Sequence, residues 1–75
     1  MITTAYKRSL QDMEDETPGK MISGALVKEL PDGRATVQYS SKPAPYLRAE
    51  LSLSGFRFYL NAWRGMASKL PKRYH

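Results

Sequence analysis

The strongest hydrophobic pattern in the chain covers its last third. From Ser54 to Leu70, apolar side chains recur at intervals of three and four residues, the period of an amphipathic helix. The apolar stripe consists of Phe56, Tyr59, Leu60, Trp63, Met66, Ala67 and Leu70, and the opposite face consists of Arg57, Asn61, Arg64 and Ser68. Ser54 suits an N-cap and Pro71 suits a helix stop. This pattern predicts a C-terminal helix over about residues 55–70 whose aromatic residues belong to the core.

A second pattern competes with this helix. Residues 46–53 alternate between apolar and polar side chains, which predicts a half-buried strand. The alternation continues through Phe56, Phe58 and Leu60 if a bulge is placed at Gly55, so residues 55–60 could form a strand and shorten the helix. The helical interpretation is preferred because the apolar stripe continues to Leu70 and both of its ends carry suitable residues.

The middle of the chain contains the clearest hairpin pattern. Residues 21–30 are predicted to form a strand in which Gly24 marks a bulge, and residues 34–40 alternate as a second strand. Between them lies Pro31-Asp32-Gly33, where proline presets φ and glycine supplies a positive φ. The sequence therefore predicts a hairpin over residues 21–40.

Together these elements predict an α+β fold. A loop that contains Pro43 and Pro45 is long enough to return strand 46–53 antiparallel to the hairpin. The expected architecture is a small three-stranded antiparallel sheet, formed by hairpin 21–40 and strand 46–53. One face of this sheet is polar, and the C-terminal helix packs on the other.

The N-terminal segment carries a weaker helical pattern. Tyr6, Leu10 and Met13 form a narrow apolar stripe that ends before Pro18 and Gly19. Its cations precede its acids, which opposes the helix dipole, and a helix this short is marginal on its own. We therefore expect three regions. They are an acidic segment over 1–19 that is a weak helix or disordered, a single α+β domain over 20–70, and a basic tail over 71–75.

Composition narrows the ways in which so short a chain is stabilised. Its 75 residues make one domain with a thin core, and chains of this size often need a disulfide, a metal or a partner subunit. There is no cysteine and the only histidine is His75, so disulfides are excluded and a zinc site is not expected. Packing and homo-oligomerisation remain, and both stay open. Without a signal-peptide pattern or a long apolar run, we expect a cytoplasmic protein that makes no membrane contact.

Charge is distributed unevenly along the chain. The net charge is +5, but residues 1–19 contain two cations and four acids, whereas residues 20–75 contain ten cations and three acids. From Leu51 onward there are five cations and no acid. An acidic lead followed by a basic remainder favours a polyanionic partner for the second half of the chain.

No motif for catalysis or cofactor binding is present in the sequence. The five glycines are scattered rather than grouped in a phosphate-binding loop, and the acidic residues lack the spacing of a calcium loop. A single histidine at the last position does not suit a catalytic triad. We therefore expect a non-enzymatic protein with no cofactor and no metal.

Two functions follow as hypotheses. The first is a small basic module that binds nucleic acid or a nucleoprotein complex through cations on the C-terminal helix and the sheet. Its candidate binding residues are Arg57, Arg64, Lys69, Lys72, Arg73, Arg34 and Arg48. The second is an adaptor or inhibitor of the phage or plasmid type, which binds a protein partner through the aromatic C-terminal helix or by homodimerisation. Its candidate contacts are Phe58, Tyr59 and Met66.

Overall fold

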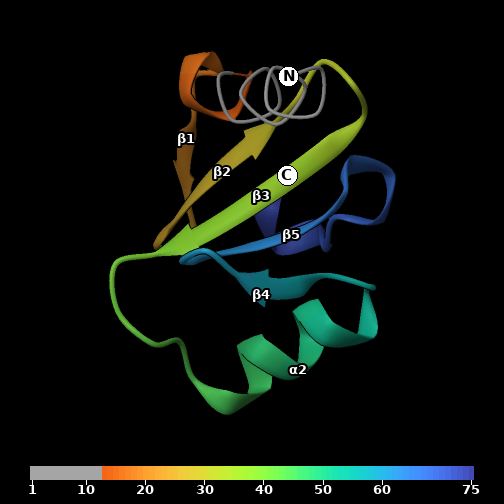
Figure 1. Cartoon of the computed structure of the whole chain (residues 1–75). Coiled ribbons are helices and arrows are strands. Elements are labelled where there is room, and N and C mark those ends of the chain that lie inside the picture. The colour runs from red at the N-terminus through yellow and green to blue at the C-terminus, as the bar shows by residue number, and fades with distance from the viewer. Residues whose placement is uncertain (1–12) are drawn as a thin grey trace.

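The computed structural model describes residues 13–75 and has an α+β fold with one five-stranded antiparallel sheet. The strands are β1 (Lys20–Ile22), β2 (Ala25–Glu29), β3 (Arg34–Tyr39), β4 (Arg57–Tyr59) and β5 (Ala62–Met66). Helix α2 (Pro45–Leu53) connects β3 to β4, and two 3-10 helices, Ala67–Lys69 and Lys72–Tyr74, follow β5. The strand order is β1-β2-β3-β5-β4, so β3 is central (Figure 1).

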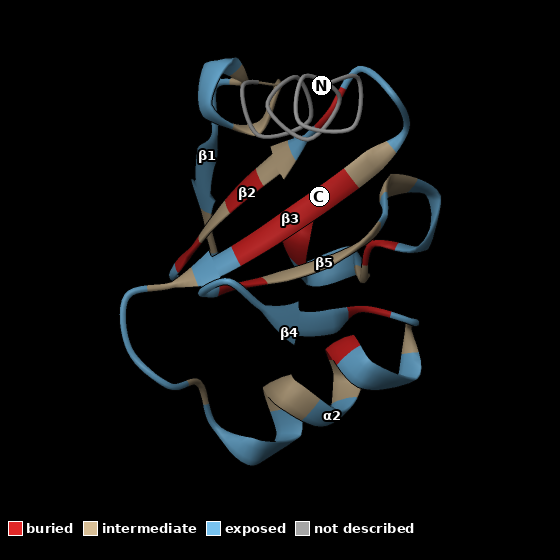
Figure 2. Cartoon of the chain, in the orientation of Figure 1, coloured by how far each residue is buried: buried red, intermediate tan, exposed pale blue. Residues whose placement is uncertain are grey.

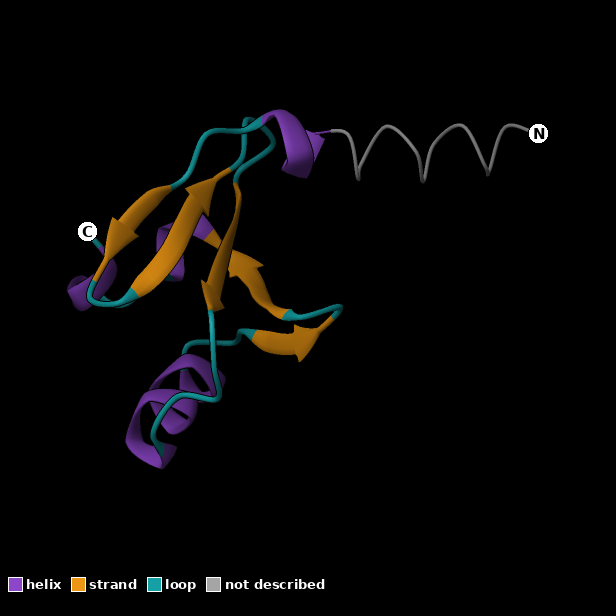
Figure 3. Cartoon of the chain, turned by 90° about the vertical axis from the view of Figure 1, so that its left-hand side faces the viewer, coloured by secondary structure: helices purple, strands orange, loops and turns teal. Residues whose placement is uncertain are grey.

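The N-terminal helix predicted within residues 1–19 lies mostly outside the described residues. Residues 13–16 form a helical turn ahead of β1. This turn and α2 lie at opposite ends of the sheet, and the β4–β5 hairpin projects between them (Figure 3). The α+β class agrees with the sequence, but the predicted architecture of three strands packed by a C-terminal helix is wrong.

The β2–β3 hairpin has the antiparallel pairing predicted around Pro31-Asp32-Gly33. Val27 lies opposite Val37, and Gly33 has a φ of 93°, the positive value that its turn requires. The N–H of Leu30 donates to the carbonyl of Arg34 over 2.8 Å and closes the loop. Local turn chemistry therefore decides this hairpin.

Gly24 does not mark a bulge, because it lies in a turn. Ser23 and Gly24 have φ values of 52° and 80°, and the residues flanking them, Ile22 and Ala25, are paired across strands. Two successive residues with positive φ suit a tight two-residue hairpin loop. The segment predicted as one strand is therefore split into β1 and β2.

The predicted strand over residues 46–53 is wrong, because this segment is helix α2. It contains no β-branched residue, and leucine, arginine, alanine and glutamate are good helix formers. Pro45 opens the helix, where its fixed φ suits the first turn and its missing N–H is not needed. The alternation of apolar residues is incidental, since Leu51 is buried whereas Leu53 is 90% exposed.

Helix α2 ends in a Schellman motif that directs the chain into β4. The N–H of Phe56 donates to the carbonyl of Leu51, and the N–H of Gly55 donates to the carbonyl of Ser52, both over 3.0 Å. Gly55 has a φ of 85°, the left-handed conformation on which this motif depends. Leu51 and Phe56 are both buried, which fits the hydrophobic contact that accompanies it. Ser54 therefore closes a helix instead of opening one.

The predicted C-terminal helix over about residues 55–70 is wrong, because β4 and β5 form a hairpin there. Leu60 and Asn61 have φ values of 51° and 64°, both positive as in a type I′ turn. β5 then pairs with β3 and places Trp63 opposite Val37. Aromatic side chains favour strands, and a helix would have carried Gly65 in its interior at a cost. The alternative strand interpretation of residues 55–60 is closer to the structure.

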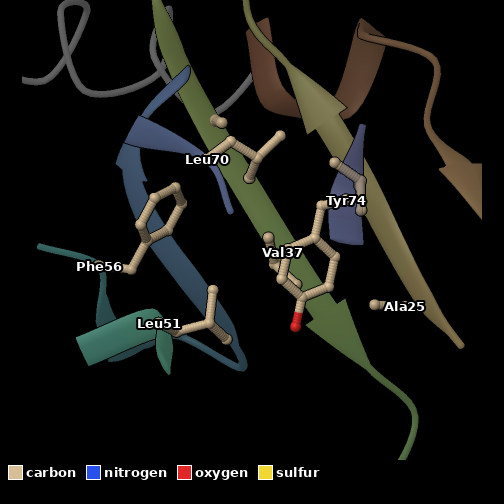
Figure 4. Packing of buried hydrophobic residues seen from close by; sticks show 8 residues of the cluster. Ala25, Val37, Leu51, Phe56, Leu70 and Tyr74 are labelled. Atoms are coloured by element: carbon tan, nitrogen blue, oxygen red, sulfur yellow. The ribbon is translucent and has the colours of Figure 1, made fainter. Parts of the chain in front are cut away.

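The core lies on one face of the sheet, where side chains from the end of α2 and from the segments after β5 pack on the strands. Figure 2 shows that the longest buried stretch of a strand is in β3. Residues paired across strands share a face, so Val27, Val37 and Trp63 form one row across β2, β3 and β5. Figure 4 shows Leu51, Phe56, Leu70 and Tyr74 gathered around Val37 of this row. The buried cluster consists of Ala25, Val27, Ala35, Val37, Leu51, Phe56, Leu70 and Tyr74.

Residues 71–75, predicted as a basic tail, contribute to this core. Tyr74 is buried, and its hydroxyl lies 2.5 Å from that of Tyr39. Burial raises the pKa of Tyr74, and the hydrogen bond with Tyr39 raises it further. The hydroxyl of Ser23 donates to the carbonyl of Arg73 over 2.8 Å, and the Arg73 guanidinium binds Glu50 of α2. The last residues thus link the β1–β2 turn to the helix.

We expect Gly65→Ala to lower the free energy of unfolding by about 1–3 kcal/mol, the usual cost of overpacking a core. A Cβ atom at Gly65 would lie 2.7 Å from the ring of Phe56, closer than packed carbon atoms approach. In a Phe56→Leu background the same substitution should cost less, because the ring that it strikes is gone. Urea denaturation of the four proteins measures this coupling, and additive effects of the two substitutions would contradict a direct contact.

Candidate functional site

The outer face of the sheet, opposite the core, carries a row of cations. The register places Lys28 beside Thr36, Thr36 beside Arg64 and Arg64 beside Arg57, so one line of side chains crosses four strands. Arg34 lies two residues before Thr36 on β3 and therefore on the same face. Like charges on neighbouring strands destabilise a sheet, so this row requires an anion close to it.

Glu14 supplies that anion from the helical turn at 13–16. Its carboxylate accepts hydrogen bonds from Nε of Arg64 over 3.1 Å and from Nη2 over 2.9 Å, and it lies 3.6 Å from Nη1 of Arg34. Nζ of Lys28 donates to the main-chain carbonyl of Glu14 over 2.7 Å. The side chains of Arg64 and Glu14 are only 15% and 18% exposed, so water screens this pair weakly.

The pairing also shifts the acidity of both partners. The hydrogen bond from Arg64 lowers the pKa of Glu14, against the opposing effect of partial burial, and the charges of Arg34 and Lys28 lower it further. The same hydrogen bond raises the pKa of Arg64. Both groups are therefore held in their charged forms.

A hollow of about 660 Å³ surrounds this carboxylate, and we call it the outer recess; its cations are Lys28, Arg34 and Arg64. Arg64 also donates to the carbonyl of Tyr59, and its guanidinium lies 4.9 Å from the centre of the Tyr59 ring. Nε of Arg34 binds Asp32 over 2.6 Å, whereas its Nη2 is buried with no hydrogen-bond partner among residues 13–75. The recess therefore holds more donors than its carboxylate uses.

A second hollow, of about 720 Å³, lies between the β3–α2 loop, α2 and the β4–β5 hairpin, and we call it the aromatic cleft. Phe58 and Trp63 form its wall, with ring centres 5.4 Å apart and an angle of 55° between the rings. Phe58 is 58% exposed. Lys42 of the loop and Arg48 of α2 also line the cleft. Nε of Arg48 is buried and has no hydrogen-bond partner in the described part of the chain.

The seven cations predicted to bind nucleic acid do not form one surface, because the helix that was to align them does not exist. Arg34, Arg57 and Arg64 lie on the outer face of the sheet, Arg48 lines the aromatic cleft, and Lys69, Lys72 and Arg73 lie in the two 3-10 helices. Three of these cations are in ion pairs: Arg34 with Asp32 and Glu14, Arg64 with Glu14, and Arg73 with Glu50. The sheet thus brings three of the seven together and separates the others.

The residues predicted to contact a protein partner, Phe58, Tyr59 and Met66, are all exposed. They do not form the single apolar strip that was expected, because strand alternation divides them. Phe58 lies in the aromatic cleft on the core side, whereas Tyr59 and Met66 lie on the outer face.

Sequence reasoning missed four residues of these two sites. The helical spacing of residues 55–70 places Trp63 in the core, and the sequence places Lys42 in the loop before residue 46, Glu14 in the acidic segment 1–19 and Lys28 in the strand 21–30, without assigning a site to any of them. Strand alternation would have placed Phe58 and Trp63 on one face. The change of charge along the chain indicates that Glu14 and its neighbours could meet the basic region, but it does not identify Arg64 as the partner.

No protein-family model, curated protein or solved structure matches this chain. Its own geometry is therefore the only basis for a functional argument. Within residues 13–75, no helix has the length and apolar character needed to cross a bilayer. The same residues bring together no group of three or more histidine, cysteine, aspartate or glutamate side chains suited to a metal ion.

The Glu14–Arg64 pair should make stability depend on pH in the acid range. Folding holds the pKa of Glu14 below its ordinary value of about 4.3, so the pair contributes stability above that pH and loses it as the pH falls through the lowered pKa. We expect the free energy of unfolding of Glu14→Gln to vary less with pH below about 4.5 than that of the unsubstituted protein. Urea denaturation over the acid range measures this difference.

Glu16→Gln is the matched control, because Glu16 is exposed and makes no ion pair with the described residues. It should keep the acid dependence of the unsubstituted protein. The pKa values of Asp32 and Glu50 are also lowered by Arg34 and Arg73, but both acids are present in all three proteins. Equal acid dependence in the three proteins would show that the Glu14 pair does not contribute.

Proposed function

We propose that this chain is a small, non-enzymatic basic module that binds single-stranded nucleic acid, alone or within a nucleoprotein complex, in the aromatic cleft. The observation that supports this most directly is the position of Arg48. Its Nε is buried with no hydrogen-bond partner within residues 13–75, and Arg48 lines the same cleft as two aromatic rings, one of which is 58% exposed. Proteins that bind single strands combine these two features, since bases stack on aromatic rings while cations neutralise phosphates.

The shape of the cleft favours an unpaired base over a duplex. Its volume of about 720 Å³ is that of a site for a small ligand, and a base splayed from a single strand is an entity of that size. Polar groups of Gln38, Ser40, Ser41 and Asn61 also line the cleft and could bond the edge of a base. These groups carry both donors and acceptors, so they would suit more than one base.

The positive charge of the cleft also supports a nucleic-acid partner. None of the described ion pairs involves Lys42 or Arg48, so both can neutralise a phosphate without first losing a carboxylate. Arg57 is also exposed on β4, but it lies on the outer face of the sheet and adds only to the overall positive charge. The net charge of +5 attracts a polyanion from a distance at low ionic strength.

We expect the unsubstituted protein to bind a short single-stranded oligonucleotide at low salt, with quenching of the fluorescence of Trp63. This is the only tryptophan in the chain and lies in the cleft wall, so its emission reports stacking directly. The logarithm of the affinity should fall linearly with the logarithm of the salt concentration, with a slope of about −0.7 for each phosphate contacted. Absence of binding, or binding that salt does not weaken, would refute the proposal.

Three substitutions locate the site in the same assay. Phe58→Ala should weaken binding by about 1–3 kcal/mol, the value of stacking one base on an aromatic ring. Arg48→Gln should reduce the salt slope by about 0.7, because one phosphate contact is lost. Lys69→Gln removes the same charge from an exposed residue that does not line the cleft, and its slope should change less. Equal effects of Arg48→Gln and Lys69→Gln would show that only net charge matters.

A second candidate function is a protein-binding adaptor or inhibitor, and the tip of the β4–β5 hairpin favours it. Leu60 is 79% exposed at that tip and has a φ of 51°, a conformation unfavourable for a branched side chain. β4 is also the last strand of the sheet, so its outer edge is open to a further strand from a partner or a second copy of this chain.

Replacement of Leu60 by asparagine separates the two functions. Leu60→Asn suits the turn better and removes the exposed apolar group, so oligonucleotide binding should be unchanged. If the tip mediates homodimerisation, light scattering should give a dimer mass for the unsubstituted protein and a monomer mass for Leu60→Asn. A monomer mass for both proteins would exclude the tip as a dimer contact.

A further inference from the structure

Two arginines meet one carboxylate in the outer recess, and a lysine binds the main chain of the same residue. Arg64 grips Glu14 with two nitrogens, at 3.1 and 2.9 Å, Arg34 approaches the same carboxylate at 3.6 Å, and Lys28 binds the main-chain carbonyl of Glu14. A planar guanidinium that binds two oxygens, supported by a second guanidinium and an ammonium, is the arrangement that proteins use to hold phosphate.

The carboxylate leaves part of this arrangement unused. The distance of 3.6 Å to Arg34 is longer than a hydrogen bond, and Nη2 of Arg34 is buried without a partner among residues 13–75. The ammonium group of Lys28 donates to a neutral carbonyl and not to a carboxylate. Asp15 also lines the recess but makes no ion pair within the described residues, and Asp32 occupies Nε of Arg34. A phosphate has more oxygens than a carboxylate and could serve all three cations.

The attachment of the segment that carries Glu14 is limited. Every described hydrogen bond and ion pair between the turn at 13–16 and the sheet is made by Glu14. The other described polar contacts of this turn are local, from the N–H and hydroxyl of Thr17 to the carbonyl of Met13. An anion that replaced the Glu14 carboxylate would therefore remove the main polar anchor of this turn.

We propose that the outer recess is a phosphate-binding site and that Glu14 occupies it as an internal substitute until a phosphate displaces it. The ligand is a phosphate group held by Arg64, Arg34 and Lys28. The inference rests on the recess and goes beyond the aromatic cleft. The two hollows share Gln38 and Asn61, but the cations of the recess and the aromatic wall of the cleft lie on opposite faces of the sheet. The carboxylate neutralises part of this positive charge in the free protein, and a competing anion has to displace it.

Titration with inorganic phosphate, followed by the Nε–H signals of the arginines in proton–nitrogen NMR spectra, tests the recess alone. In Glu14→Gln, the signal of Arg64 should shift with saturation, at an apparent Kd about tenfold lower than in the unsubstituted protein, because the competing charge is gone. Glu16→Gln makes the same chemical change two residues away and should behave like the unsubstituted protein. An Arg64 signal that phosphate leaves in place in Glu14→Gln would overturn the proposal, and so would equal affinities of the two variants.

Glu14→Asp is a second variant that keeps the phosphate test valid if Glu14→Gln does not fold. It keeps the charge that stabilises the outer face but shortens the side chain by one methylene, so it should weaken the grip of Arg64 and give an affinity between those of Glu14→Gln and the unsubstituted protein. If Glu14→Gln is unfolded, a phosphate affinity of Glu14→Asp equal to that of the unsubstituted protein would overturn the inference.

A single-stranded oligonucleotide then identifies the source of the phosphate. If the nucleic-acid backbone is the ligand, the oligonucleotide should shift the Arg64 signal of Glu14→Gln and steepen its salt slope by about 0.7 for each added phosphate contact. A response to inorganic phosphate alone would assign the recess to a small free phosphate. Trp63 quenching reports the aromatic cleft separately, so a silent Trp63 with a responsive Arg64 would refute only the proposed function. A responsive Trp63 with an Arg64 signal that neither inorganic phosphate nor the oligonucleotide shifts would refute only this inference.

Discussion

The contact between Phe56 and Gly65 determines the arrangement of the other parts of the molecule. The Schellman motif at Gly55 turns the chain sharply after α2 and directs the ring of Phe56 toward β5. The ring can lie flat on that strand only because Gly65 has no side chain, since any Cβ there would overlap it. This close approach fixes the end of α2 against the sheet. Arg48 of the same helix lines the aromatic cleft together with Phe58 and Trp63, so the placement of α2 against the sheet contributes to the shape of that cleft.

The sequence determines some of this fold locally and leaves the rest to long-range pairing. The β2–β3 hairpin could be predicted because Pro31-Asp32-Gly33 encodes its own turn. Residues 46–53 were predicted wrongly because alternation was given more weight than the absence of β-branched residues. Residues 55–70 fit a helical period well, and the strands are selected by the local turn at Leu60 and Asn61 together with pairing to β3, which is distant in the chain. The wrong helix assignment of residues 55–70 also made the predicted surfaces of the candidate sites wrong. The cations were identified as residues, but the surface on which each one lies depends on the strand assignment.

Two arginines of the outer face are paired with acids, whereas the cations of the aromatic cleft have no acidic partner among residues 13–75. On the outer face, Glu14 and Asp32 neutralise Arg64 and Arg34, so the density of charge there is tolerated in the free protein. In the cleft, the described residues provide no acid to Lys42 or Arg48, and the positive charge stays available. A small chain cannot bury many charges, because each needs a partner or water. The distribution of its few acids therefore decides which cations are free to meet a ligand.

The order of the strands also has a kinetic consequence. β1, β2 and β3 join through short turns, as do β4 and β5, so each of these units can form from neighbouring residues. The pairing of β3 with β5 must instead close a chain segment that contains the whole of α2. Loop closure has to be completed before its contacts add stability, so this step is expected to limit the rate at which the protein folds.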